Sequence, residues 1–157
     1  MKKIGQYTAR GTINEADTAA GNPQKIPLFD GSFSTAYRVI GFHIWGSDYG
    51  GSANPDCIGK LSKNDIGTLS AGNFMRADDD NQIAWAWFGA STDAGGSSSQ
   101  DPIIDKDNLV VEDLYVYGRS VNTETTDPIN YMVVMEKYEI SDWQGALAMA
   151  RDRADGE

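Results

Sequence analysis

The sequence predicts a mainly β fold, a β-sandwich or jelly roll of about seven to eight strands with one C-terminal α-helix. Segments rich in Val, Ile, Tyr and Trp alternate with clusters of Gly, Ser, Asn and Asp, and the chain holds 17 glycines, which indicates many turns. No convincing helical pattern separates these segments before Ser141, so a βαβ arrangement is disfavoured. A chain of 157 residues can bury its own core, and residues 1–157 are expected to form one domain.

Two strands are expected in the first thirty or so residues. Residues 3–13 have a strand-like pattern of Tyr, Thr and Ile, and the glycines within them, Gly5 and Gly11, weaken the strand or mark bulges. Residues 25–29 form a candidate edge strand, because Pro27 has no backbone N–H to donate to a neighbouring strand. The Asp-Gly pair that follows is a turn signal.

Residues 37–45 carry the strongest strand pattern of the first half of the chain. Strict alternation puts its side chains on two opposite faces, namely Tyr37, Val39, His43 and Trp45 on one, and Arg38, Ile40, Phe42 and Ile44 on the other. Residues 57–61 follow as a candidate short strand.

Residues 82–88 are expected to form a compact strand. Its large side chains, Ile83, Trp85 and Trp87, share one face, and two alanines occupy the other. The small residues predict that another part of the chain packs tightly against the alanine face. Residues 93–100 are rich in Gly and Ser and are expected to be an exposed flexible loop.

The last third of the chain organises the core. Residues 109–120 and 129–140 read as two strands around a polar loop, the pattern of a hairpin. Each strand has two largely apolar faces: Val110, Leu114 and Val116 against Val111, Tyr115 and Tyr117, then Tyr131, Val133 and Met135 against Met132, Val134 and Tyr138. Such strands suit a sheet that is covered on both sides, or one that uses its second face as an interface.

A helix is expected at about residues 142–154. Ser141 is a suitable N-cap, and Gln144 completes a Ser-x-x-Gln capping box. Gly145 is unfavourable inside a helix by about 1 kcal/mol relative to alanine, so we expect it to lie close to a neighbouring backbone. A stripe of apolar residues at helical spacing is expected to dock on the sheet: Trp143, Leu147 and Ala150.

Charge and hydropathy exclude several classes of partner. The net charge of −10 argues against nucleic acid as a direct ligand, because phosphate neutralisation needs clustered Lys and Arg. The first residues contain no apolar segment of the kind found in a signal peptide. No apolar run approaches the ~20 residues of a membrane span, so no membrane association is expected.

No pattern of residues indicates an enzyme, a metal site or a cofactor site. The acidic clusters at 78–81 and 101–108 offer oxygen ligands of the kind that Ca²⁺ accepts, but they lack the EF-hand glycine and are expected to be turns. His43 has no nucleophile in a recognisable motif. Cys57, the single cysteine, cannot form an internal disulfide and is expected to be a small, half-buried side chain.

Four stretches of the chain together resemble a known group of proteins. They are IGQYTARGT at 4–12, IPLFDGSFSTAYRV at 26–39, DNQIAWA at 80–86, and the C-terminal segment 107–154 that ends in INYMVVMEKYEISDWQGALAMARDRA. These stretches resemble small, uncharacterised proteins that tailed bacteriophages of marine bacteria encode near their virion genes. The resemblance implies a virion structural protein, made in the bacterial host cytoplasm and located in the virion.

The expected function is therefore a self-associating bacteriophage structural protein, capsid-associated or a decoration protein, with itself and other virion proteins as partners. Its contact surface is expected on the first strand and the last two strands, at Tyr7, Arg10, Ile13, Tyr115, Tyr117 and Tyr131. The alternative is a carbohydrate-binding or host-recognition module of a phage tail or fibre, with Trp45, Trp85 or Trp87 stacking on sugars. A small hydrolase with a carboxylate pair is a third and weaker alternative.

Overall fold

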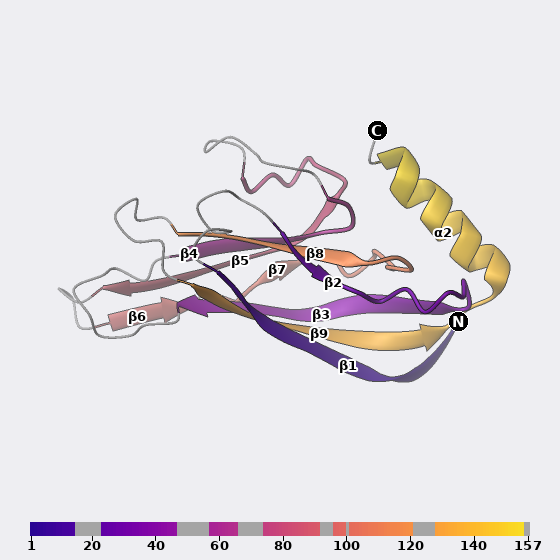
Figure 1. Ribbon diagram of the computed structural model, residues 1–157, viewed down its shortest axis with the longest axis horizontal. Coiled ribbons are helices and arrows are strands. Elements are labelled where there is room, and N and C mark those ends of the chain that lie inside the picture. The colour runs from indigo at the N-terminus through magenta and orange to yellow at the C-terminus, as the bar shows by residue number, and fades with distance from the viewer. Residues whose placement is uncertain are drawn as a thin grey trace.

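The computed structural model describes residues 1–14, 23–46, 57–65, 74–91, 96–99, 101–120 and 128–155, and it confirms a mainly β fold with one C-terminal helix. Two antiparallel sheets face each other as a β-sandwich, and helix α2 lies at one end of it, beside the N-terminus (Figure 1). The first sheet has the order β1 (Lys2–Ile13), β9 (Ile129–Glu139), β3 (Thr35–Gly46). The second has the order β2 (Gln24–Ile26), β8 (Leu114–Ser120), β4 (Cys57–Ser62), β5 (Gln82–Ser91), β6 (Gly96–Ser99), while β7 (Ile103–Ile104) also pairs with β5. Helix α2 spans Asp142–Asp155.

The last two strands do not form the expected hairpin. β8 pairs with β2 and β4 in the second sheet, whereas β9 pairs along its whole length with β1 and β3 in the first. The chain therefore crosses from one layer of the sandwich to the other between these strands. Two alternating strands joined by a polar loop can form a hairpin or can lie in different sheets. Here β9 pairs with the long strands β1 and β3 and not with β8, so the two strands lie in different sheets. The predicted faces of β9 are correct, because Tyr131, Val133 and Met135 lie in the core.

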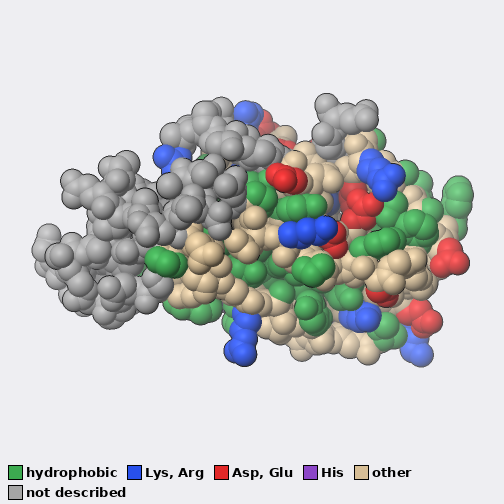
Figure 2. Space-filling view, viewed as in Figure 1, with side chains coloured by type: hydrophobic (Ala, Val, Ile, Leu, Met, Phe, Trp, Pro, Cys, Tyr) green, Lys and Arg blue, Asp and Glu red, His purple; other side chains and the backbone are tan. Residues whose placement is uncertain are grey.

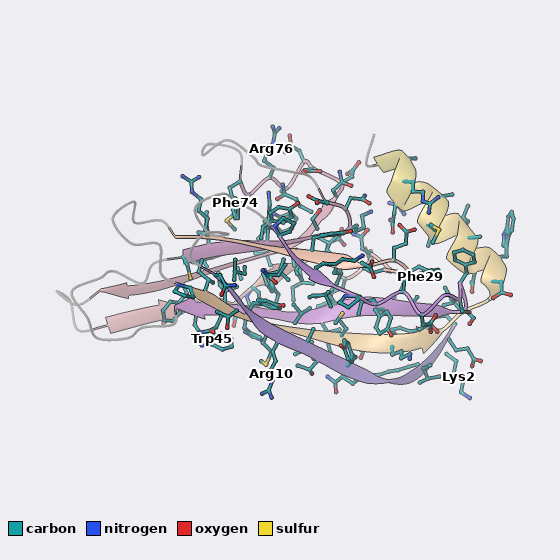
Figure 3. The ribbon with its side chains drawn as sticks, in the orientation of Figure 1. Lys2, Arg10, Phe29, Trp45, Phe74 and Arg76 are labelled. Atoms are coloured by element: carbon teal, nitrogen blue, oxygen red, sulfur yellow. The ribbon has the colours of Figure 1, made fainter. Side chains whose placement is uncertain are left out.

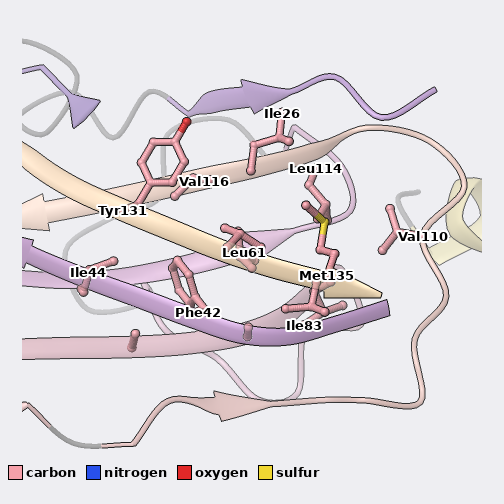
Figure 4. Close-up of a cluster of buried hydrophobic side chains, with 14 of the residues drawn as sticks. Ile26, Phe42, Ile44, Leu61, Ile83, Val110, Leu114, Val116, Tyr131 and Met135 are labelled. Atoms are coloured by element: carbon pink, nitrogen blue, oxygen red, sulfur yellow. The ribbon is translucent and has the colours of Figure 1, made fainter. Parts of the chain in front are cut away.

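A β-bulge in β3 corrects the predicted faces of that strand. The register with β9 shifts between Val39 and Gly41, so one extra residue is inserted and the alternation reverses. Tyr37 and Val39 before the bulge and Phe42 and Ile44 after it therefore all point into the core (Figure 4 shows Phe42 and Ile44).

The core lies between the two sheets, and β5 presents its small residues to it. Ala84 and Ala86 are buried there, which confirms the tight packing predicted for the alanine face. Trp85 and Trp87 are only partly buried on the outer side of the same strand, so they are not core residues. Ile83 is expected on the same face as the two tryptophans, but it lies in the core. A register shift near the start of β5 turns its side chain inward.

Two further segments behave differently from the expectation. Residues 96–99 form β6, which pairs with β5, although the whole stretch 93–100 reads as a flexible loop. Edge pairing uses backbone groups, so a Gly/Ser sequence can join a sheet when its neighbour offers a free edge. The turn at Gly31 follows the prediction: its φ of 86° is the left-handed conformation that glycine favours, and Asp30 accepts a hydrogen bond from the Ser32 N–H.

The helix begins as the sequence predicts. The Ser141 Oγ accepts a hydrogen bond from the Gln144 N–H at 3.3 Å, and the Gln144 Oε1 accepts one from the Ser141 N–H at 3.3 Å. These two bonds are the reciprocal pair of a capping box.

Removing this cap should weaken the helix measurably. We expect Ser141→Ala to lower the free energy of unfolding by about 1 kcal/mol, because an orphan N–H of the first turn loses its acceptor. Urea unfolding followed by far-ultraviolet circular dichroism measures the change, and Ser141→Asp, which keeps an acceptor, is the control. Equal stability of the wild type and Ser141→Ala would contradict the role of the cap.

Candidate functional site

The structure places the six predicted contact residues in very different environments. Tyr7 is 44% exposed and Arg10 is exposed on β1, and Tyr115 is partly exposed on β8. The other three predictions are wrong, because these side chains fill the chain's own interior and cannot be offered to another subunit: Ile13, Tyr117 and Tyr131 are 0%, 1% and 7% exposed.

Large apolar side chains are instead exposed around helix α2. Trp143 is 76% exposed and Leu147, one turn later, is 60% exposed. Met1, 60% exposed, lines a groove together with Leu147. The exposed rings of Phe29 and Phe33 pack on each other with their centroids 5.7 Å apart, beside the first turns of the helix. We call Trp143, Leu147, Met1, Phe29 and Phe33 the α2 patch.

The α2 patch corrects the predicted orientation of the helix. The stripe expected to dock on the sheet, Trp143, Leu147 and Ala150, faces outward. The side that packs on the sandwich carries Gly145, Met149 and Asp152.

A close backbone contact explains this orientation. A Cβ built at Gly145 would lie 1.9 Å from the Phe33 carbonyl oxygen, so only glycine lets the helix approach this segment. The close approach itself is what the sequence predicts for Gly145.

A buried ion pair holds the other end of the helix. The Lys63 Nζ lies 2.9 Å from the Asp152 Oδ1, and the side chains are 2% and 8% exposed. The Asn64 Nδ2 also donates to the backbone oxygen of Asp152 at 3.0 Å. Neither residue is marked by periodicity, because Lys63 follows a strand and Asp152 sits among charged residues. Together with Gly145, these contacts fix α2 so that its apolar stripe stays on the surface.

A groove runs beside the exposed stripe. Its volume is about 260 Å³, and its apolar lining includes Met1, Leu109, Ile140 and Leu147. Arg151 lines the same groove together with Asp107 and Asp152, so the polar part of the lining carries charges of both signs. Figure 2 shows hydrophobic side chains reaching the surface at this end of the molecule.

Lys60 is the most strongly perturbed ionisable group of the second sheet. Its side chain is 0% exposed on the face of β4 that points away from the core, and its Nζ lies 4.5 Å from the ring centre of Phe74 and 4.9 Å from that of Tyr117. Within the described part of the chain, no hydrogen-bond acceptor meets this Nζ. Burial lowers the pKa of Lys60 to about 8, and the nearby charge of Asp79 opposes this shift.

The sequence does not signal this burial, because a lysine in a strand normally marks a solvent-facing position. A perturbed lysine is often found at functional sites. Lys60, however, is enclosed by aromatic rings and has no exposed surface through which a ligand could reach it.

An ion-pair cluster links β1 to β9 in the first sheet. Glu136 contacts Lys3 of β1 and accepts a hydrogen bond from the Tyr138 hydroxyl. The hydrogen bond from Lys3, with that from Tyr138, lowers the pKa of the Glu136 carboxyl. The Lys3 side chain is 52% exposed, so solvent screens its ion pair with Glu136 and the pair contributes little to stability.

The acidic clusters use their carboxylates within their own turns. Asp79 accepts hydrogen bonds from Asn81 and Gln82, and Asp105 accepts from the Asp107 N–H and from Asn108. Among the described residues, no three His, Cys, Asp or Glu side chains are placed to hold a metal ion together. His43 is exposed on β3, and Cys57 is a buried side chain with 2% exposure rather than a half-buried one.

None of the described helices is long and apolar enough to cross a membrane. Comparisons of the chain with protein-family models, with curated proteins and with solved structures give no match.

Proposed function

We propose that this chain is a self-associating structural protein of a bacteriophage virion, capsid-associated or a decoration protein, and that it acts mechanically rather than as a catalyst. The observation that carries the proposal is the α2 patch, because a small β-sandwich that exposes Trp143 and Leu147 side by side leaves apolar surface to bury against a neighbour. Burial of such surface favours association by about 25 cal/mol per Å² before the entropy of association is subtracted. The virion part of the proposal is supported by the resemblance of the sequence to phage proteins.

The mass of the purified protein in solution tests self-association. We expect light scattering over a concentration series in moderate salt to show a closed oligomer or a polymer whose mass grows with concentration. Sedimentation with capsids assembled from the major capsid protein of the same genome tests the location. A monomer at every concentration that also fails to sediment with capsids would overturn the proposal.

One observation favours the alternative of a carbohydrate-binding module. Trp45 is 40% exposed near the end of β3, away from α2 (Figure 3), and exposed tryptophans are what a sugar platform requires. Trp85 and Trp87 are half-buried, and the Trp85 Nε1–H donates to the Gln82 Oε1 at 2.9 Å. Titration with oligosaccharides should quench or shift tryptophan fluorescence in the wild type and not in Trp45→Ala if this alternative holds. An unchanged wild-type spectrum would remove it.

A further inference from the structure

We propose that the outward stripe of α2 is a two-fold contact, on which α2 of a second copy of this chain packs in the antiparallel direction. The stripe consists of Trp143, Leu147, Ala150 and Ala154, all exposed and spaced at i, i+4, i+7 and i+11. This spacing keeps the four residues on one side of a helix, as in the seam between two paired helices. The proposal rests on the proposed self-association and names its contact surface.

The size of the side chains favours a helix as the partner. Ala146, Ala150 and Ala154 are small and exposed, so the backbones of two helices can approach closely along this side. Trp143 and Leu147 are large and stand at one end of the stripe. An antiparallel partner brings the large end of one helix against the small end of the other, and the two surfaces fill each other.

The charges of α2 select the antiparallel direction. Asp142 lies in the first turn, and the exposed Arg151 and Arg153 lie near the last. When the two-fold axis passes between Leu147 and Ala148, Asp142 of one copy lies beside Arg153 of the other, because both residues fall on the same side of the stripe. The Arg153 guanidinium, which also contacts Glu112 of its own chain, can pair there with the carboxylate. A parallel pair would place like charges opposite each other at both ends.

The two-fold symmetry also explains how one helix supplies both halves of the contact. In an isologous interface the same patch serves both copies, so every favourable contact is made twice. The groove beside the stripe, lined by Met1 and Leu109, lies next to Leu147 and extends the apolar area beyond the helix itself.

Sedimentation velocity of the full chain over a concentration series tests the contact. We expect Trp143→Ala to weaken association by at least about thirtyfold, the effect of losing a central aromatic anchor. Trp45→Ala is the matched control, because Trp45 is also an exposed tryptophan but lies away from α2 (Figure 3), and it should associate as the wild type does. Circular dichroism should show unchanged folding in both variants, since both side chains are exposed.

A charge exchange tests the direction of the helices. Asp142→Arg and Arg153→Asp should each weaken association when studied alone, because each places like charges together. An equimolar mixture of the two variants should associate again, and so should the chain that carries both changes, because opposite charges then face each other.

The outcomes separate this inference from the proposed function. A wild type that associates while Trp143→Ala associates equally well would overturn the α2 contact and leave self-association standing. Charge variants that weaken association singly and fail to restore it in the mixture would overturn the antiparallel arrangement. A wild type that is monomeric at every concentration would overturn the proposed self-association and the contact with it.

Discussion

Replacing Gly145 with alanine is expected to lower the free energy of unfolding by about 3 kcal/mol, at the upper end of the usual loss from overpacking. On a free helix the same change would be favourable by about 1 kcal/mol, because alanine is the better helix former. Here the new methyl group would lie 1.9 Å from the Phe33 carbonyl oxygen and 2.8 Å from its carbon. Both are backbone atoms, so the helix itself must move away and its contacts with the sandwich weaken. Urea unfolding followed by circular dichroism measures the loss.

Gly5→Ala is the matched control for this prediction. Gly5 lies on β1, and a Cβ built there has no heavy atom within 4 Å. Its backbone does not need a positive φ, because Gly31 is the one glycine with that conformation among the described residues. We therefore expect Gly5→Ala to change the stability by no more than about 0.5 kcal/mol. If Gly145→Ala proves as stable as Gly5→Ala, the helix does not depend on its close contact with Phe33.

The contrast between α2 and the strands shows what a sequence pattern can decide. The capping box and the close contact of Gly145 are predictable, because each depends on the chemistry of one or two residues. The orientation of the helix is not, because α2 has apolar residues on its outer stripe and Met149 on its inner side. The inner side packs on the sandwich because Gly145 approaches Phe33 closely and Asp152 forms a buried ion pair with Lys63. Phe33 and Lys63 are far from the helix in the sequence, so the pattern of the helix alone does not reveal these contacts.

The strands show the same limit in another form. Their existence follows from composition and alternation, but the faces of β3 reverse at the bulge between Val39 and Gly41. A glycine within a strand can mark a bulge or only weaken the strand, so Gly41 by itself does not predict the reversal. The sequence does not show which strands pair either, since β8 and β9 follow each other in the chain and yet belong to different sheets. Tyr131 lies in the core between the sheets, and Tyr117 is buried beside Lys60 on the outer face of β8, although both read as an interface. The exposed apolar surface is instead the α2 patch, and it can be recognised only once the orientation of the helix on the sandwich is known.

Lys60→Met is expected to raise the free energy of unfolding by about 2 kcal/mol at neutral pH. The wild type keeps an ammonium group between the rings of Phe74 and Tyr117, which offset its desolvation only in part. Methionine fills a similar volume without a charge, and replacing a buried charge by such a side chain is often stabilising. Chemical unfolding of the two proteins at neutral pH measures the difference. Lys63→Met is the control with the opposite sign, because it removes the partner of the buried Asp152 and should destabilise by about 3 kcal/mol.

The pH dependence identifies the charge as the cause. Folding lowers the pKa of Lys60 from its usual 10.5 to about 8, so between these values the unfolded chain binds more protons than the folded one. In this window the penalty for burying the ammonium falls as the pH rises, and below pH 8 it is present in full. The stability advantage of Lys60→Met should therefore be constant below about pH 8 and shrink steadily toward pH 10.5. Comparing the two proteins at each pH cancels the ionisation of groups that they share, including the tyrosines. An advantage that stays constant across this range would show that packing alone, and not the buried charge, separates the two proteins.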